Sequence, residues 1–473
     1  MFFGKYAFNS RLQQTLIAII SVLLLGIAWY KLPHPGLAAI SLLPLLLVAS
    51  LRMPFLLCLA FIAFSFFRLH EVFPALYPLK IPQLLAIGTL GSLLVNLITR
   101  RIEVFWCKEH SLFMFFFLLV VVGALLATNR AAAMHSFTGT YIKIATMVFA
   151  ISWLLRKEIQ FKLLLLAMML CGIAVGFIAL QNKSNGLELV EGTRVTIGRS
   201  IGSMLGDPND LSLVLLFPAS FALSILMTPG FSKLWKVIGI ISFLTVVCAV
   251  IATQSRGGLL GICAVTGIFA WRRVQNKALL ISIGVCCLGL LFILAGVSDR
   301  ASGGAHEEGI DESAMGRIYA WQAAIGMAIH HPLTGVGINN FISNYFDYSP
   351  HWDGRNHAVH STWFGVLAET GLLGLLLFIG LIIMIAKIGL KTVARFKPTE
   401  SPHYSPALYA CAQSVQAGLA GFCVSGTFLT MGFTWPIYIL LALAIALAQY
   451  APSSSQNDSQ NKKKQIKHSP IKT

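Results

Sequence analysis

The chain has 473 residues and a net charge of +17, with 56% hydrophobic residues, 11% charged residues and a mean hydropathy of +0.77. A soluble domain carries about 25% charged residues because its surface faces water, so this composition excludes a soluble globular protein. The positive charge lies in short clusters between apolar runs, which argues against a nucleic-acid partner. The composition predicts an all-α, polytopic integral membrane protein, since helices satisfy every backbone group in lipid.

A helix that crosses a bilayer needs about 20 mostly apolar residues. This rule predicts 12–14 transmembrane helices, the shortest or interrupted candidates being the second, third and tenth. The candidates are 13–30, 36–51, 54–68, 82–98, 111–127, 139–155, 162–180, 209–228, 236–254, 257–271, 278–297, 362–386, 404–425 and 434–450.

These spans divide the chain into five parts. Residues 1–180 hold the N-terminal spans, and 181–297 hold central spans with a Ser-Arg-Gly element. Residues 298–361 form one large loop, 362–450 hold the C-terminal spans, and 451–473 form a basic tail that is predicted to be disordered.

The basic residues predict the orientation of the spans. Lysine and arginine concentrate in loops on the cytoplasmic side of a membrane protein. When the loops alternate, about two thirds of the 35 basic residues fall on the side of the N-terminus. Both termini are therefore expected in the cytoplasm, and the loop 298–361 is expected in the periplasm.

Ser313 to His331, within this large loop, predicts an amphipathic helix. Ile318, Trp321 and Ile325 recur at helical spacing, and Pro332 ends the run. We expect this helix to lie in the plane of the membrane interface, with Trp321 at headgroup depth.

His360-Ser361, nine further residues and then Gly371-Leu372-Leu373-Gly374 form the most specific pattern in the chain. His360 lies where the large loop meets a span, and its ordinary pKa near neutrality suits proton transfer. The alternative is an ordinary interfacial histidine. The two glycines lie inside the span, where small residues allow close helix approach.

This pattern resembles the signature of the O-antigen ligase family, His-[Asn/Ser/Gln]-x9-Gly-x2-Gly, at every fixed position. Ser255-Arg256-Gly257 is similar to the family's Ser-Arg-Gly element. Gly316-Arg317, with Trp321 four residues on, is similar to its outer-loop pattern, and Gly206-Asp207-Pro208-Asn209 resembles an element before a span. The resemblance covers roughly residues 198–377.

The resemblance implies a glycosyltransferase that moves a glycan from undecaprenyl pyrophosphate to an acceptor hydroxyl, such as one on lipid A-core. It places the reaction at the periplasmic face of the bacterial inner membrane, with inversion and without a covalent intermediate. Arginine grips phosphate oxygens bidentately, so we predict that Arg256 and Arg317 bind the pyrophosphate and that His360 acts as general base.

Other residues are weaker candidates for substrate binding, and for some a structural role is a close alternative. Arg256 could instead be a snorkelling loop arginine and Glu369 a buried helix-pairing carboxylate. The substrate-binding candidates are Arg199, Asp207, Asn209, Trp321 and Glu369.

No metal and no other cofactor is expected. His351, His357 and His360 lie close together in sequence beside Asp353, but their spacing matches no ligand pattern, and the nine cysteines include no CxxC. Fixed arginines supply the positive charge that a metal would otherwise provide.

Three alternatives to a ligase remain open at this stage. An O-antigen polymerase and a protein O-oligosaccharyltransferase belong to the same superfamily, whereas a membrane transporter or flippase belongs to another class. Paired repeats and charges at mid-membrane are typical of transporters, and the sequence shows neither. The sequence does not identify the donor sugar, the acceptor or the oligomeric state.

Overall fold

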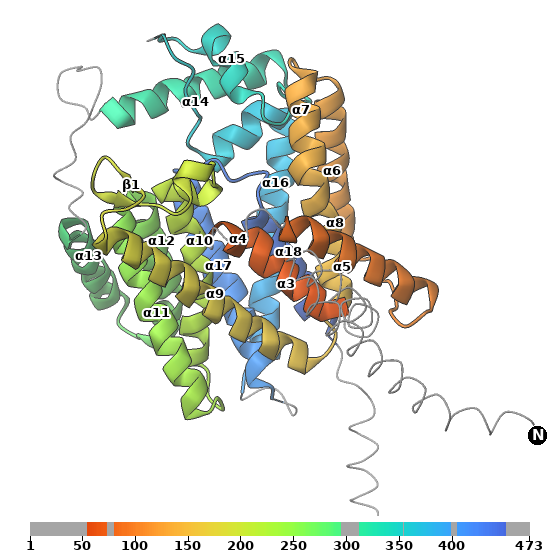
Figure 1. Cartoon of the computed structure of the whole chain (residues 1–473), viewed down its shortest axis with the longest axis vertical. Helices are drawn as coiled ribbons and strands as arrows, with labels where there is room; N and C mark the ends of the chain where they lie inside the picture. Colours follow the sequence, from red (N-terminus) through yellow and green to blue (C-terminus); the bar gives the residue numbers. More distant parts are fainter. Residues whose placement is uncertain (1–53, 73–79, 295–311, 353, 399–403, 451–473) are drawn as a thin grey trace, which may run out of the picture.

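The computed structural model describes residues 54–72, 80–294, 312–352, 354–398 and 404–450, and it shows a helical bundle with a cap at one end (Figure 1). The bundle helices are α3 (Pro54–Phe66), α5 (Ile81–Ile98), α6 (Lys108–Leu125), α7 (Arg130–Ser136), η2 (Phe137–Tyr141), α8 (Ile142–Leu154), α9 (Glu158–Ser184), α10 (Pro208–Met227), α11 (Lys233–Thr253), α12 (Arg256–Arg273), α13 (Lys277–Leu294), α16 (Thr362–Arg395), α17 (Pro406–Gly426) and α18 (Trp435–Gln449).

Short elements lie between these helices. They are α4 (Leu69–Val72), β1 (Leu189–Val190), β2 (Arg194–Val195), the 3-10 turns η3 (Arg199–Ile201) and η4 (Met204–Gly206), α14 (Glu312–His330) and α15 (Phe341–Tyr348). The two strands pair antiparallel, with Val190 opposite Arg194. The sequence did not predict this ribbon.

The all-α membrane fold is confirmed. Within the described ranges, eight helical stretches are long and apolar enough to cross a membrane, and three further apolar helices are shorter. Each predicted span after residue 53 coincides with a helix, although α12 carries three arginines and falls outside both groups. The predicted spans 13–30 and 36–51 and the tail 451–473 lie outside the described residues.

Helix α10 forms the centre of the bundle, because it is buried on nearly all sides. It contacts α9, α11, α12 and α17. Ser224 of α10 shares a 2.7 Å hydrogen bond with Ser414 of α17, the kind of small polar contact that joins helices in lipid. Outer helices instead expose apolar side chains, such as Ile87 and Phe115, as a lipid-facing surface requires.

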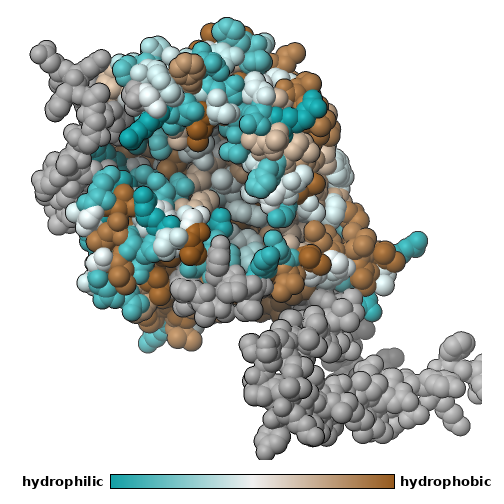
Figure 2. Space-filling view, turned by 45° about the horizontal axis from the view of Figure 1, so that its top comes forward, coloured by the Kyte–Doolittle hydropathy of each residue, from teal (hydrophilic) through white to brown (hydrophobic). Residues whose placement is uncertain are grey.

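The end of the bundle that carries α14, α15 and the β1–β2 ribbon is called the cap end here. Contacts between distant loops define it: Ser203 donates a hydrogen bond to Glu71, and the backbone N–H of Asn129 donates to Asn340 Oδ1 at 2.8 Å. Figure 2, in which this end is turned forward, shows a hollow between the cap and the ribbon segment.

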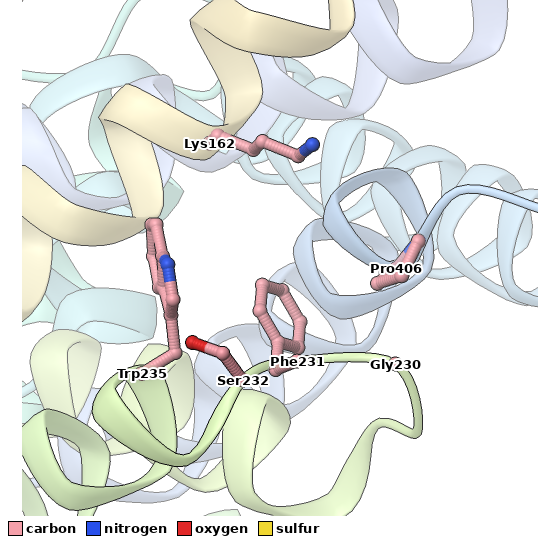
Figure 3. Close-up of a pocket in the computed structure, with 6 residues that line it drawn as sticks. All are labelled: Lys162, Gly230, Phe231, Ser232, Trp235 and Pro406. Carbon is pink, nitrogen blue, oxygen red and sulfur yellow. The ribbon is translucent and has the colours of Figure 1, made fainter.

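The opposite end gathers short loops with basic residues. Arg156, Arg273 and Arg395 each donate to backbone carbonyls there, which ties neighbouring helix ends together. A recess of about 170 Å³ lies at this end, and Lys162 and Trp235 are among the residues that line it (Figure 3).

Candidate active site

The Ser-Arg-Gly element forms a tight turn between α11 and α12 at the cap end. Gln254 adopts a left-handed conformation (φ 51°) and ends α11. Ser255 then caps α12, because its Oγ accepts a hydrogen bond from the Gly258 N–H at 3.1 Å. Arg256 is consequently the first residue of α12, and its side chain is exposed at the cap end.

Arg194 lies beside this turn and is nearly buried, with 8% of its surface exposed. Its Nη2 donates to Asn209 Oδ1 at 2.8 Å, and its Nε donates to the carbonyl of Thr253 at 3.3 Å. The nearest carboxylate oxygen belongs to the exposed Glu191, at 3.9 Å. Burial lowers the pKa of Arg194, Glu191 and Asp207 oppose this shift, and the charges of Arg317 and Arg256 act in the same direction as burial.

The segment 206–209 joins this arginine to the turn. Asp207 caps α10 by accepting hydrogen bonds from the N–H groups of Asn209 (2.7 Å) and Asp210 (3.3 Å). Asn209 Oδ1 accepts from Ser255 Oγ at 2.9 Å as well as from Arg194. Arg194, Asn209 and Ser255 therefore form one network immediately next to Arg256.

Arg317 comes from α14, which the sequence predicted within one residue at each end. Its guanidinium lies over the ring of Phe428, 5.7 Å from the centroid, so the loop after α17 supports it. The charge of Arg317 acts on both Arg194 and His360. Three arginines, Arg194, Arg256 and Arg317, thus form a cationic cluster at the cap end.

His360 stands just before α16 with a left-handed backbone (φ 46°). Its side chain is partly accessible, yet burial by the surrounding segments, followed by the charge of Arg317, lowers the pKa of His360. Asp207 opposes this shift. The neutral imidazole is therefore favoured near neutral pH, and it is the form that accepts a proton.

Trp321 holds the segment that carries His360. Its Nε1 donates to the carbonyl of Val359 at 3.2 Å, and its ring stacks on Phe364 at 5.0 Å and 13°. It points into the protein, whereas the exposed face of α14 carries Ile318 and Ile325. The position of Trp321 at headgroup depth stays a prediction, and within the protein its ring packs beside the segment that carries His360.

Glu369 and Gly371 seat the cap on α16. Gly371 has φ 71° and ψ −173°, which breaks α16 into two helical parts. At this break the loop 332–337 adds backbone hydrogen bonds, from Val336 N–H to the Ala368 carbonyl (2.9 Å) and from Leu372 N–H to the Pro332 carbonyl (2.8 Å).

Glu369 is buried, and its Oε1 accepts from the N–H of Phe341 at 3.3 Å, at the start of α15. Gly371 therefore makes room for the loop 332–337. The sequence had instead predicted that the glycines of this span allow another helix to approach. Glu369 caps α15 and lies away from the cationic cluster.

Of the predicted site residues, the structure brings Arg256, Arg317, His360 and Asp207 into one electrostatic neighbourhood. Arg199 is occupied elsewhere, because its Nη1 donates to the Gly206 carbonyl at 3.1 Å.

Sequence reasoning missed Arg194. It was one of several arginines predicted on the outer side, and the two-residue strand that buries it leaves no readable pattern.

Groups of three or more His, Cys, Asp or Glu side chains arranged to hold a metal ion do not occur among the described residues, which leave out Asp353.

The bundle and its cap define a polytopic helical membrane protein with a cationic, histidine-containing site at one end. The family model described as O-antigen ligase matches residues 241–379, a segment that contains Arg256, Arg317, His360 and Gly371. Over these residues the chain is similar to the O-antigen ligase family. No curated protein matches the chain. This match supports, in general terms, a ligase-like glycosyltransferase activity with a lipid-linked glycan and an acceptor as the types of substrate.

Proposed function

We propose that this protein is a glycan ligase that transfers a glycan from undecaprenyl pyrophosphate to an acceptor hydroxyl of lipid A-core or a similar terminal acceptor. The observation that carries the proposal is the convergence of three arginines, an aspartate and a histidine at one end of the bundle. Arg256, Arg317 and His360 of this group lie in the segment that matches the family model.

The cationic cluster suits a pyrophosphate. Arg194 is buried and its hydrogen-bond partners are neutral, while the charges of Arg317 and Arg256 act on it against those of Glu191 and Asp207. Like charges held together cost free energy unless an anion joins them. A pyrophosphate supplies that anion, and a fixed guanidinium stabilises the charge that develops on it during transfer without reorganising.

The reaction is a single displacement at the anomeric carbon of the donor glycan. The acceptor oxygen forms the new bond to this carbon, while the bond to the pyrophosphate oxygen breaks and its electron pair leaves with undecaprenyl pyrophosphate. His360 takes the proton of the acceptor hydroxyl. Inversion of the anomeric centre follows, since one displacement occurs without a covalent intermediate.

We place the cap end in the periplasm and both termini in the cytoplasm. Support comes from the basic residues of the described ranges, which concentrate at the opposite end in Arg156, Lys157, Lys233, Lys236, Arg272 and Arg273. Basic loops stay in the cytoplasm. The protein then resides in the bacterial inner membrane, with the site open to a glycan already carried across it.

The test compares cells that lack the gene and carry either the wild-type gene or the Arg317→Ala variant. Surface glycolipids are resolved by gel, and lipid-linked glycans are extracted in parallel. Loss of the long-chain ladder, with long polymer accumulating on the carrier, supports the ligase. Acceptors that carry a single repeat indicate a polymerase instead. An unchanged glycolipid profile overturns the proposal and directs the search to glycoproteins.

Metal independence forms part of the proposal, because the arginines take the role of a divalent cation. Transfer by the purified protein is expected to persist in excess EDTA. A loss that Mg²⁺ or Mn²⁺ restores would contradict this part and leave the rest standing.

A further inference from the structure

Two aromatic side chains of the cap are exposed although they lie on no membrane span. Phe346 of α15 is 58% exposed and Trp352 is 42% exposed. Their rings meet edge to face, with centroids 4.8 Å apart and planes 78° from parallel. Figure 1 shows α15 on the outer side of the cap, away from the bundle, so lipid around the bundle does not account for their exposure.

This pair is anchored firmly to the cap. The ring of Tyr345, which is 1% exposed, contacts Trp352 at 6.4 Å and His357 at 5.3 Å. Tyr319 of α14 stacks on His351 at 4.9 Å and 26°. The pair is therefore held in place by buried and stacked neighbours.

The pair is also continuous with the candidate site. Tyr345 contacts both Trp352 and His357, and the charge of His357 acts on His360. Ring contacts thus lead from the exposed Phe346 and Trp352 to His357, whose charge acts on the proposed general base. A ligand that covers the pair would therefore lie on the same part of the cap as the proposed general base.

The surroundings of the pair are polar. His351, Arg355 and Asn356 are exposed in the same stretch. An aliphatic chain or a flat protein interface core would favour a continuous apolar surface. A sugar ring presents an apolar C–H face bordered by hydroxyl groups, and it matches an aromatic face with polar neighbours.

We propose that Phe346 and Trp352 form the binding platform for the saccharide part of the acceptor. The inference rests on the proposed transferase function and adds a substrate subsite to it. Phe346 and Trp352 hold the acceptor glycan by stacking, which directs its hydroxyl towards His360, while the cationic cluster holds the donor. Donor and acceptor then occupy different elements of the cap end.

The kinetic test uses full-length protein in nanodiscs, a saturating lipid-linked donor and increasing amounts of lipooligosaccharide isolated from the deletion strain. Trp352→Ala and Phe346→Ala are each expected to raise the acceptor KM about tenfold. The donor KM and kcat at saturating acceptor stay unchanged, and Trp352→Tyr restores most of the affinity. Trp271→Ala is the matched control, because Trp271 is 52% exposed but lies at the opposite end of the bundle.

A binding arm separates the sugar from the lipid. Binding of the intact lipooligosaccharide and of its deacylated oligosaccharide is measured by titration calorimetry. Weakening of both by Trp352→Ala supports the platform. If Trp352→Ala weakens binding of the intact lipooligosaccharide alone, the pair binds acyl chains. If it weakens binding of neither molecule, a second protein copy or nothing covers the pair. Both results overturn the inference.

The two proposals fail in different ways. If the wild-type protein transfers glycan but neither aromatic variant changes the acceptor KM, the platform is wrong and the ligase stands. If the wild-type protein transfers nothing, yet binds the oligosaccharide through Trp352, the platform stands and the proposed reaction is wrong.

Discussion

Replacing Gly371 with alanine adds one methyl group at the break of α16. The backbone there, with φ 71° and ψ −173°, lies in a region that is nearly exclusive to glycine, and the strain costs about 1–3 kcal/mol. The new Cβ would also overlap the carbonyl of Pro332, and overpacking of this kind costs about 1–3 kcal/mol more. The total of about 2–6 kcal/mol is a large part of a domain's stability of about 5–15 kcal/mol.

We expect the protein to relieve this strain by releasing the loop 332–337 from α16, since the new methyl group meets the loop at the carbonyl of Pro332, which accepts a hydrogen bond from Leu372. The cap then shifts, and Arg317 moves away from His360. Transfer should fall by at least about 100-fold, which corresponds to about 2.7 kcal/mol, while the amount of inserted protein stays normal.

The assay measures transfer by purified protein and cleavage of the cap by a protease. Gly380→Ala, in the same helix, is the control, because its Cβ meets only Leu112 at 3.6 Å or beyond. Transfer by Gly371→Ala within about twofold of the wild type would refute the reasoning, since a loop that tolerates the methyl group is not seated by glycine.

Three further outcomes follow from the site. Arg194→Gln loses a charge-assisted hydrogen bond worth about 1.5–3 kcal/mol, so kcat/KM for the donor should fall about 10–150-fold. The loss should be smaller in Arg194→Lys, which keeps the positive charge. Equal losses in the two variants would show that charge is irrelevant at this position. The acid limb of kcat/KM should have its midpoint below the ordinary histidine pKa of about 6.5, because burial and Arg317 disfavour the protonated form of His360. In Asp207→Asn the limb should move to still lower pH, because a carboxylate that favours the imidazolium is gone; a shift upward would contradict this assignment. Trp321→Phe keeps the stacking on Phe364 but loses a hydrogen bond of about 0.5–1.5 kcal/mol, so kcat should fall up to about tenfold at normal protein abundance. An unchanged kcat would show that this hydrogen bond does not position His360.

The helices were predictable because hydrophobicity along the chain is nearly uniform within spans and stops at charged loops. Helix α14 shows the limit of this reasoning. Its periodicity predicted its length, but not which side faces the protein. Ala320, Ala323 and Ala324 are buried, whereas the larger Ile318 and Ile325 are exposed. Periodicity cannot separate a lipid or solvent surface from a close protein contact, which favours small side chains.

Residues of the candidate site could be selected from the sequence where they lie in a motif. Arg256, Arg317 and His360 lie in recognisable motifs. Arg194 could not be chosen from its neighbours, because its burial depends on a pairing between two short strands and on Asn209, fifteen residues away. Arg199 was a weaker candidate without a motif of its own, and its Nη1 donates a hydrogen bond to the Gly206 carbonyl.

The seating of the cap on α16 also sets the order in which the site is completed during synthesis. Arg194 of β2 and Arg256 of α12 precede the cap helices, whereas the hydrogen bonds that join the loop 332–337 to α16 need residues 368–372. A nascent chain that ends before α16 therefore carries part of the cationic cluster without a positioned Arg317 or His360. Catalytic competence appears late in membrane insertion, once the bundle that supports it is already in place.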